Sequence, residues 1–458
     1  MTEGYKPITI QSEKPEELPN LPELALQYEL KGDPEKYKYY SSGTRWYWNI
    51  SKGEQFDDET KARMLLAQKE ELPFLVSAVM ERACNLQCAH CLYQNEKSSK
   101  KASEEGDLAK VIEHMVRSMP HASVDGPPAK FMSAGRTLQP WHLAVFKKLS
   151  EIRPDVKLGV IDNGTFEKER ILSKWPDGFK LDWLDISIDG IKEHHDEQRG
   201  ESSYGQAIKG LNRAREVVRP SAEGGYVASL LTLTRINAED PLKVADELFK
   251  IQENGMPLID KLNLTTMGPT NAINERDPEL EINVEDFAKA WEEIKKACAK
   301  YNTPDNERIF LGLYRVEDVE KLATVVGEKK FMESFSADAK EANNNGTAIR
   351  GNFIELHIDG VPVSYLPISI WPPEEMVIEA DAAYRVAYEG QFTLDELHAG
   401  KSKDGRNTKP YTVAQLTPET DFREVYEKAV DLYWQRFGHK KLDEEFAAFQ
   451  RIRAKAGA

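Results

Sequence analysis

From Phe74 onward the chain alternates short apolar runs with amphipathic segments, and this alternation limits its fold more than any other feature. Such a pattern is typical of βα units, in which parallel strands are joined by helices. Six units can be counted, with predicted strands at 74–80, 129–133, 156–162, 183–189, 226–234 and 260–267. Six consecutive units predict a partial (β/α)6 TIM-like barrel of the α/β class, with ligands bound at the carboxyl ends of its strands.

The same pattern divides the chain into three predicted segments. Residues 1–73 have no clear period and are predicted to form an N-terminal extension, and residues 74–302 form the barrel. From about residue 303 the alternation is lost, so 303–458 is predicted to be an α+β C-terminal region. Within it, a hairpin is predicted over 351–366, turning at Asp359-Gly360.

Helix signals are clear in four places. One helix is predicted to begin after Asp240, a good N-cap, and to end at Gly255. The other three predicted helices cover 284–301, 421–437 and 442–456.

Composition and charge limit the partners and the compartment. No apolar run reaches the length of roughly 20 residues that crosses a bilayer, and the N-terminus lacks the pattern of a secretory signal. We therefore expect a cytoplasmic protein with no membrane partner. A formal net charge of -16 argues against nucleic acid as the main partner, because phosphate binding needs clustered Lys and Arg.

Three of the four cysteines lie close together directly after the first predicted strand. Cys84, Cys88 and Cys91 have C-x3-C-x2-C spacing. Thiolates favour iron–sulfur clusters, zinc or copper(I), and three ligands leave one iron of a 4Fe-4S cluster open. A structural zinc site is the alternative, but it needs a fourth ligand such as His90 and usually a second pair of ligands from another turn. The sequence contains no second pair.

Over roughly residues 70–300 the chain resembles the radical S-adenosylmethionine superfamily. The resemblance lies in the cysteine loop ERACNLQCAHCLY, in Asn163-Gly164 after the third strand, and in DISIDGIKEHHDEQRG at 185–200, which is similar to the SPASM peptide-modifying branch. It implies that Cys84, Cys88 and Cys91 hold one 4Fe-4S cluster whose open iron binds S-adenosylmethionine. Reductive cleavage of this cofactor then gives a 5'-deoxyadenosyl radical.

The resemblance also implies a set of cofactor-binding residues. His90 occupies the position of an aromatic ring against the adenine, and Asn163 begins the Asn-Gly turn. Ser187 and Arg199 match residues that bind the methionine carboxylate, for which a guanidinium is well suited.

Gly135 lies in a segment that departs from the family pattern. The chain has Ala134-Gly135-Arg136 where Gly-Gly-Glu is usual. Backbone carbonyls there can still accept from the methionine ammonium, but Arg136 cannot replace the acid.

The C-terminal region resembles a SPASM domain that has lost its auxiliary clusters, with Ser364 or Tyr365 where a cysteine ligand is expected. A single cluster favours redox-neutral reactions, namely epimerisation, rearrangement or fragmentation. Cys298, the remaining cysteine, is a candidate hydrogen-atom donor, but its place on the apolar face of the 284–301 helix is more typical of a small core residue.

The sequence therefore predicts a radical S-adenosylmethionine enzyme that modifies a ribosomally made peptide in natural product biosynthesis. A small molecule such as a sugar or an amino acid derivative is the alternative substrate. An external reductant such as flavodoxin or ferredoxin is implied. A non-catalytic zinc- or iron–sulfur-binding adaptor is the alternative from another class.

Overall fold

The computed structural model describes a set of ranges that covers most of the chain. These ranges are 57–70, 75–78, 84–86, 88–90, 102–119, 130–133, 138–164, 166, 169–252, 255–266, 280–303, 306, 308–313, 316–336, 355–358, 368–371, 375–378, 412–415, 417, 419–434 and 439–457. Several predictions fall outside them. These concern Cys91, Gly135, Arg136, the turn at Asp359-Gly360, Ser364 and Tyr365.

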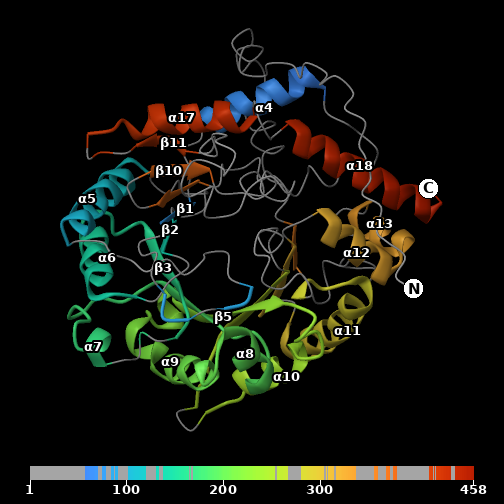
Figure 1. Ribbon diagram of the computed structural model, residues 1–458, viewed down its shortest axis with the longest axis horizontal. Coiled ribbons are helices and arrows are strands. Elements are labelled where there is room, and N and C mark those ends of the chain that lie inside the picture. Colours follow the sequence, from blue (N-terminus) through green and yellow to red (C-terminus); the bar gives the residue numbers. More distant parts are fainter. Residues whose placement is uncertain are drawn as a thin grey trace, which may run out of the picture.

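Eight parallel strands follow one another around the barrel in the order of the sequence, with helices on their outer side (Figure 1). The strands are β1 Leu75–Ala78, β2 Lys130–Ser133, β3 Lys157–Asp162, β4 Trp183–Ser187, β5 Tyr226–Leu233, β6 Lys261–Thr266, β7 Ile309–Leu313 and β8 Glu355–Ile358. The six predicted strands correspond to β1–β6, so the predicted α/β class with a partial TIM-like barrel is confirmed.

The alternation of strands and helices continues past residue 303, contrary to our expectation. β7 pairs in parallel with β6, and α12 (Val316–Val326) and α13 (Glu328–Ser336) follow it. β8 in turn pairs in parallel with β7. β7 is a short apolar run, IFLGL, that we did not predict as a strand. The division into three segments stays a prediction.

The other edge of the sheet is extended by strands from the C-terminal region. β9 (Ile368–Trp371) pairs in parallel with β1, and β10 (Glu375–Ile378) and β11 (Thr412–Gln415) continue the sheet in antiparallel pairs. Helices from both ends of the chain lie nearby, with α4 (Asp58–Glu70) packed on α17 (Phe422–Tyr433). A strand of the C-terminal region therefore supports the strand that precedes the cysteine loop.

Two ion pairs hold α4 against the C-terminal helices. Lys69 Nζ lies 2.6 Å from Asp431 Oδ1, and the buried Lys61 Nζ lies 2.9 Å from Asp443 Oδ1 of α18 (His439–Ala456). A buried lysine without such a partner would be costly, so the Lys61 pair fixes the position of α4.

The helices of the barrel form a ring around the sheet (Figure 1). They are α5 Ala102–Ser118, α6 Pro140–Ile152, α7 Glu169–Leu172, α8 Lys192–Arg199, α9 Ser203–Val217, α10 Pro241–Leu248 and α11 Val284–Tyr301. The helix predicted at 284–301 is confirmed, and Asn283 caps it by accepting a hydrogen bond from the Asp286 N–H. The helices predicted at 421–437 and 442–456 correspond to α17 and α18.

The helix predicted from Asp240 to Gly255 begins where expected but ends early, at Leu248. Gly255 instead forms a separate turn with φ +79°. Asp240 occupies the N-cap position, yet its carboxylate accepts from the Ile191 N–H at 3.1 Å and pairs with His194 Nδ1 at 2.6 Å. It therefore ties α10 to the loop before α8.

The two faces of the strands differ in burial. On β7, for example, Ile309, Leu311 and Leu313 are buried under the helices, whereas Phe310 and Gly312 on the inner face are only half-buried. β5 and β6 show the same contrast over part of their length. No helix in the described ranges is long and apolar enough to cross a membrane.

Candidate active site

The described part of the cysteine loop lies at the carboxyl end of β1, where a barrel of this kind binds ligands. It docks on the end of α8, since the Ala89 N–H donates to the Gln198 carbonyl at 2.8 Å. Within the loop, the Leu86 N–H lies 3.5 Å from Cys84 Sγ. The loop is thus held by backbone contacts to an element more than 100 residues further along the chain.

Asn163, predicted from the Asn-Gly turn after β3, lies against this loop. Its Nδ2 donates to Asn85 Oδ1 at 2.9 Å and approaches Cys84 Sγ at 3.7 Å. Asp162 shapes the turn by accepting from the Gly164 N–H at 2.7 Å. Gly164 has φ +85°, and a Cβ there would come within 2.5 Å of Ala207 Cα, so only glycine fits.

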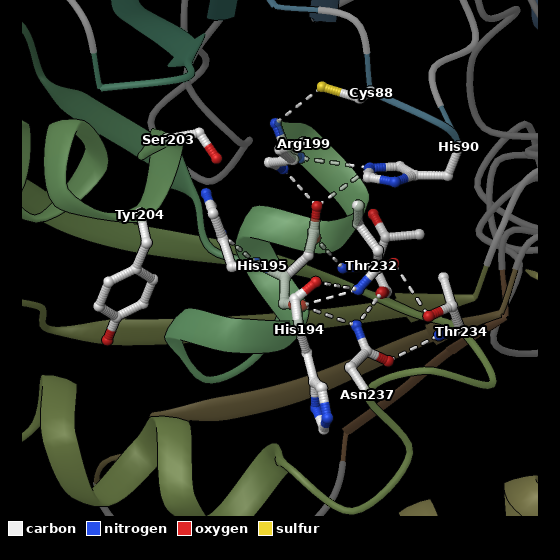
Figure 2. Close-up of polar contacts among 12 residues, drawn as sticks. Cys88, His90, His194, His195, Arg199, Ser203, Tyr204, Thr232, Thr234 and Asn237 are labelled. Atoms are coloured by element: carbon white, nitrogen blue, oxygen red, sulfur yellow. Dashed lines mark hydrogen bonds and ion pairs between the residues drawn. The ribbon is translucent and has the colours of Figure 1, made fainter. Parts of the chain in front are cut away.

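Arg199 is the last residue of α8 and points toward the cysteine loop (Figure 2). Its Nη1 lies 3.9 Å from Cys88 Sγ, and its Nη2 lies 3.5 Å from His90 Nε2. Its Nε donates to Asp189. The guanidinium therefore joins one predicted cluster ligand, one predicted adenine-contacting residue and a carboxylate.

Asp189 is the charged centre of this arrangement and was not singled out from the sequence. Its side chain is fully buried; Oδ2 lies 3.0 Å from His90 Nε2, and Oδ1 accepts from the Thr232 N–H at 2.8 Å. Burial alone would raise the pKa of Asp189, but Arg199 and His90 outweigh it and hold that pKa well below its usual range. Its position in the 185–200 segment was the available signal.

The backbone of Asp189 is held as firmly as its side chain. The N–H donates to His195 Nδ1 at 3.0 Å, and the carbonyl accepts from Gln198 Nε2 at 3.0 Å and Asn237 Nδ2 at 3.1 Å (Figure 2). Burial, with help from the positive Arg199, lowers the pKa of His195 to about 4, so this ring stays neutral and can accept. Asp189 thus has very little freedom to move.

The structure also locates the other predicted residues. Ser187 ends β4 and is buried on the same face of the strand as Trp183 and Asp185. Cys298 is fully buried on α11 and belongs to the hydrophobic core, with the helix itself in the outer ring (Figure 1). Its role as a hydrogen-atom donor stays a prediction.

The donor set fits an iron–sulfur cluster held by thiolates. Cys84 and Cys88 each lie beside a side-chain N–H donor, from Asn163 and Arg199, and such donors stabilise sulfur ligands and tune a bound cluster. His90 Nδ1 is buried and has no hydrogen-bond partner among the described residues, which leaves a polar atom for a bound group. No three His, Cys, Asp or Glu side chains gather as a metal site within the described ranges, which do not include Cys91.

Comparison with known proteins gave matches among solved structures alone. No protein-family model and no curated protein matches the chain. SuiB of Streptococcus suis bound to the precursor peptide SuiA shares 12% identity, with 81% of this chain and 69% of that chain covered and a TM-score of 0.47. SuiB bound to S-adenosylmethionine has a TM-score of 0.44, at 12% identity over 81% of this chain and 70% of that one.

A third structure, native anSMEcpe with bound AdoMet, shares 13% identity over 84% of this chain and 98% of that chain, with a TM-score of 0.46. The chain is similar to proteins that bind S-adenosylmethionine. At TM-scores below 0.5 we draw nothing further from the likeness, and the proposals below rest on the residues of the site.

Proposed function

We propose that the chain is a radical S-adenosylmethionine enzyme. The observation that carries the proposal is the placement of Cys84 and Cys88, which follow β1, against Asn163 and Arg199, which follow β3 and β4. Residues from three separate βα units therefore converge on two thiols of a C-x3-C-x2-C motif. A zinc site built from one short loop has no need of this convergence.

In the proposed site Cys84, Cys88 and Cys91 hold a 4Fe-4S cluster. Such a cluster, when bound together with S-adenosylmethionine, supplies an electron whose delivery cleaves the cofactor to a 5'-deoxyadenosyl radical. The protein contributes positioning and charge. Asp189 occupies the Nε edge of Arg199 and so directs the Nη edge toward the cysteine loop, where it is placed to bind a carboxylate.

Ser187, Gly135 and His90 complete the proposed cofactor site. Ser187 lies at the carboxyl end of β4, two residues before Asp189, and its hydroxyl is the proposed second donor to the methionine carboxylate. Gly135 is proposed to accept from the methionine ammonium through its backbone carbonyl. The His90 ring, held by Asp189, is proposed to lie against the adenine.

The proposed reaction is redox-neutral and acts on a ribosomally made peptide, with electrons from a flavodoxin or ferredoxin. No cysteine follows Cys298 in the sequence, so auxiliary clusters with cysteine ligands are absent from the C-terminal region. Without them a substrate radical has no second cluster nearby to take its electron. Epimerisation, rearrangement or fragmentation need no such acceptor.

Anaerobic reconstitution with iron and sulfide tests the cluster. We expect about four irons per chain, and cleavage of S-adenosylmethionine after addition of dithionite. Cys84→Ala and Cys88→Ala should each abolish both, whereas the matched control Cys298→Ala should keep both. A protein that binds one zinc and no iron would favour the adaptor alternative and end this proposal.

The substrate is tested by mass spectrometry of a small precursor peptide encoded beside the enzyme, incubated with it in heavy water. Deuterium uptake without any other change of mass indicates epimerisation. If Cys298→Ala leaves the product and its stereochemistry unchanged, Cys298 is not the hydrogen-atom donor. An unchanged peptide in the presence of active cofactor cleavage would contradict a peptide substrate.

A further inference from the structure

A group of charged side chains lies inside the barrel, below the proposed cofactor site and not used by it. Leu184 and Ile186 of β4 belong to the hydrophobic core under the helices, so Asp185 between them faces the interior. The register pairs Asp185 with Ala228 of β5, and Ala228 with Lys261 of β6. Asp185 and Lys261 therefore lie at one level of the barrel, with Cα atoms about 10 Å apart.

Two lysines contribute positive charge to this interior without an acidic partner. Within the described ranges, the side-chain ammonium groups of Lys130, the first residue of β2, and of Lys261 have no hydrogen bond and no ion pair. Burial lowers the pKa of Lys130, and the nearby positive charge of Lys261 lowers it further. The two ammonium groups therefore repel each other, and in the described part of the chain no carboxylate is paired with either of them.

Asp185 is near Lys261 but does not form an ion pair with it. Its side chain is 8% exposed, and its Oδ1 is buried with no hydrogen-bond partner in the described part of the chain. Burial raises the pKa of Asp185 to about 7, although Lys261 opposes that shift. Near neutral pH the carboxyl is therefore partly protonated and able to donate as well as to accept.

Aromatic rings surround the Lys261 ammonium on the inner face. Its Nζ lies 4.6 Å from the centroid of the Tyr226 ring and 5.4 Å from that of Phe310. Trp183 stacks on Tyr226 with centroids 6.3 Å apart. The ammonium contacts these rings, and within the described ranges it donates no hydrogen bond to an oxygen or nitrogen atom, so donors remain for a ligand.

We propose that Lys130, Lys261 and Asp185 form a binding subsite inside the barrel for a carboxylate group of the substrate. A carboxylate there accepts from both ammonium groups and balances their charge, and the Asp185 hydroxyl donates to it when protonated. In a peptide substrate this group is an Asp or Glu side chain or the C-terminal carboxylate. This assignment of a substrate class rests on the proposed function.

The position of the subsite suits that role. Asp185 lies two residues before Ser187 on the same face of β4. It is therefore about 7 Å further than Ser187 from the carboxyl end of the strand. A carboxylate bound at Lys261 would place the neighbouring part of the substrate next to the proposed cofactor site. The subsite would thereby set which hydrogen of the substrate faces the radical.

The test measures binding of small probes to the reconstituted protein with S-adenosylmethionine present, by isothermal titration calorimetry. The probes are hippurate, which carries an aromatic ring and a carboxylate, the neutral hippuramide, and phenyl phosphate. We expect hippurate to bind at least about tenfold more tightly than hippuramide. Lys261→Gln and Lys130→Gln should each weaken hippurate binding by about tenfold or more, and Lys261→Arg should retain it.

Lys157→Gln is the matched control, because Lys157 also begins a strand but its Nζ is already paired with Asp182 Oδ1 at 3.0 Å. It should leave hippurate binding unchanged. Equal binding of hippurate and hippuramide, or an unchanged affinity in Lys261→Gln, would overturn the subsite. Tighter binding of phenyl phosphate than of hippurate would replace a carboxylate by a phosphate ligand.

Iron content and cofactor cleavage, measured on the same preparations, separate the two proposals. A normal cluster and normal cleavage without carboxylate selectivity would reject the subsite alone. A wild-type protein that binds no iron after reconstitution would reject the proposed function, independently of which probes bind.

Discussion

Two groups of buried charged side chains in the barrel differ in how they are paired: the group around Asp189 at the carboxyl ends of the strands (the upper level), and the group around Asp185 further inside. At the carboxyl ends of the strands Asp189 has hydrogen bonds or ion pairs with Arg199, His90 and the Thr232 N–H. Deeper in the barrel, Asp185, Lys130 and Lys261 form no ion pair with one another. The first group is satisfied within the protein, whereas the second has no such partner among the residues that the structure describes.

The difference teaches what each level contributes. A charge network that is satisfied by the protein holds its members in one geometry before any ligand binds, which suits the positioning of a cofactor. A group of unpaired charges costs stability and regains it when a complementary ligand arrives, which suits recognition. The predictions below test this contrast, beginning with the largest expected effect.

Replacing Asp189 by Asn should disturb the upper level most. It removes the one negative charge between Arg199 and His90, and loss of one member of a buried charge network costs about 3–5 kcal/mol. We expect a large fall in thermal stability, and also in iron content after reconstitution, because the cysteine loop loses its contact through His90. The exposed Asp177→Asn is the control and should change neither.

The pH dependence of the Asp189 contribution follows from its lowered pKa. The unfolded chain takes up the proton first, so the contribution is complete above the ordinary Asp value of about 4 and is lost as the pH falls below it. A wild-type protein that loses no more stability in acid than Asp189→Asn would contradict the network described above.

Replacing Asp185 by Asn should raise the stability of the protein, whereas Asp189→Asn lowers it. The pKa of Asp185 is raised to about 7, so the folded protein holds the proton more tightly and loses stability as the pH rises from about 4 through 7. Asp185→Asn removes that loss. We expect it to stabilise the protein by about 2–4 kcal/mol near pH 8, with a gain that shrinks toward pH 4, measured by denaturant unfolding across pH. Parallel curves for the two proteins would show that Asp185 is not buried as described.

Replacing Arg199 by Lys should sharpen the contrast by separating charge from geometry. The lysine keeps the positive charge near Asp189 but loses the planar fork that can bind a carboxylate through two hydrogen bonds. We expect the dissociation constant for S-adenosylmethionine to rise about 10- to 100-fold, measured by equilibrium dialysis. Arg213→Lys, on the exposed face of α9, is the control, and equal effects of both variants would remove Arg199 from the cofactor site.

Sequence reasoning found the first six strands because their apolar runs are bounded by clear helical patterns. It missed β7, and it assigned the residues of β8 to a hairpin over 351–366 and not to the barrel. It extended the helix after Asp240 to Gly255 because it took the nearest glycine as the end of the helix. The apolar stripe gave no signal that α10 stops at Leu248.

The candidate site was predictable where it depended on spacing and missed where it depended on pairing. Cys84, Asn163 and Arg199 stand at marked positions after strands, so their convergence follows from the barrel. The role of Asp189 became visible only in the structure, because its partners His90 and Thr232 lie far from it in the sequence. The subsite at Asp185 and Lys261 depends on strand register, which sequence periodicity does not give.

The pairing of β9 with β1 has a consequence for biosynthesis. The strand that leads into the cysteine loop contacts β2 on one side and β9 on the other, with Ser77 opposite Ser369. During translation, β1 and Cys84 leave the ribosome long before β9 has been made. The strand that leads into the loop therefore gains its second neighbour only when a much later part of the chain is synthesised, and metal delivered to the nascent polypeptide before then would meet an incomplete support.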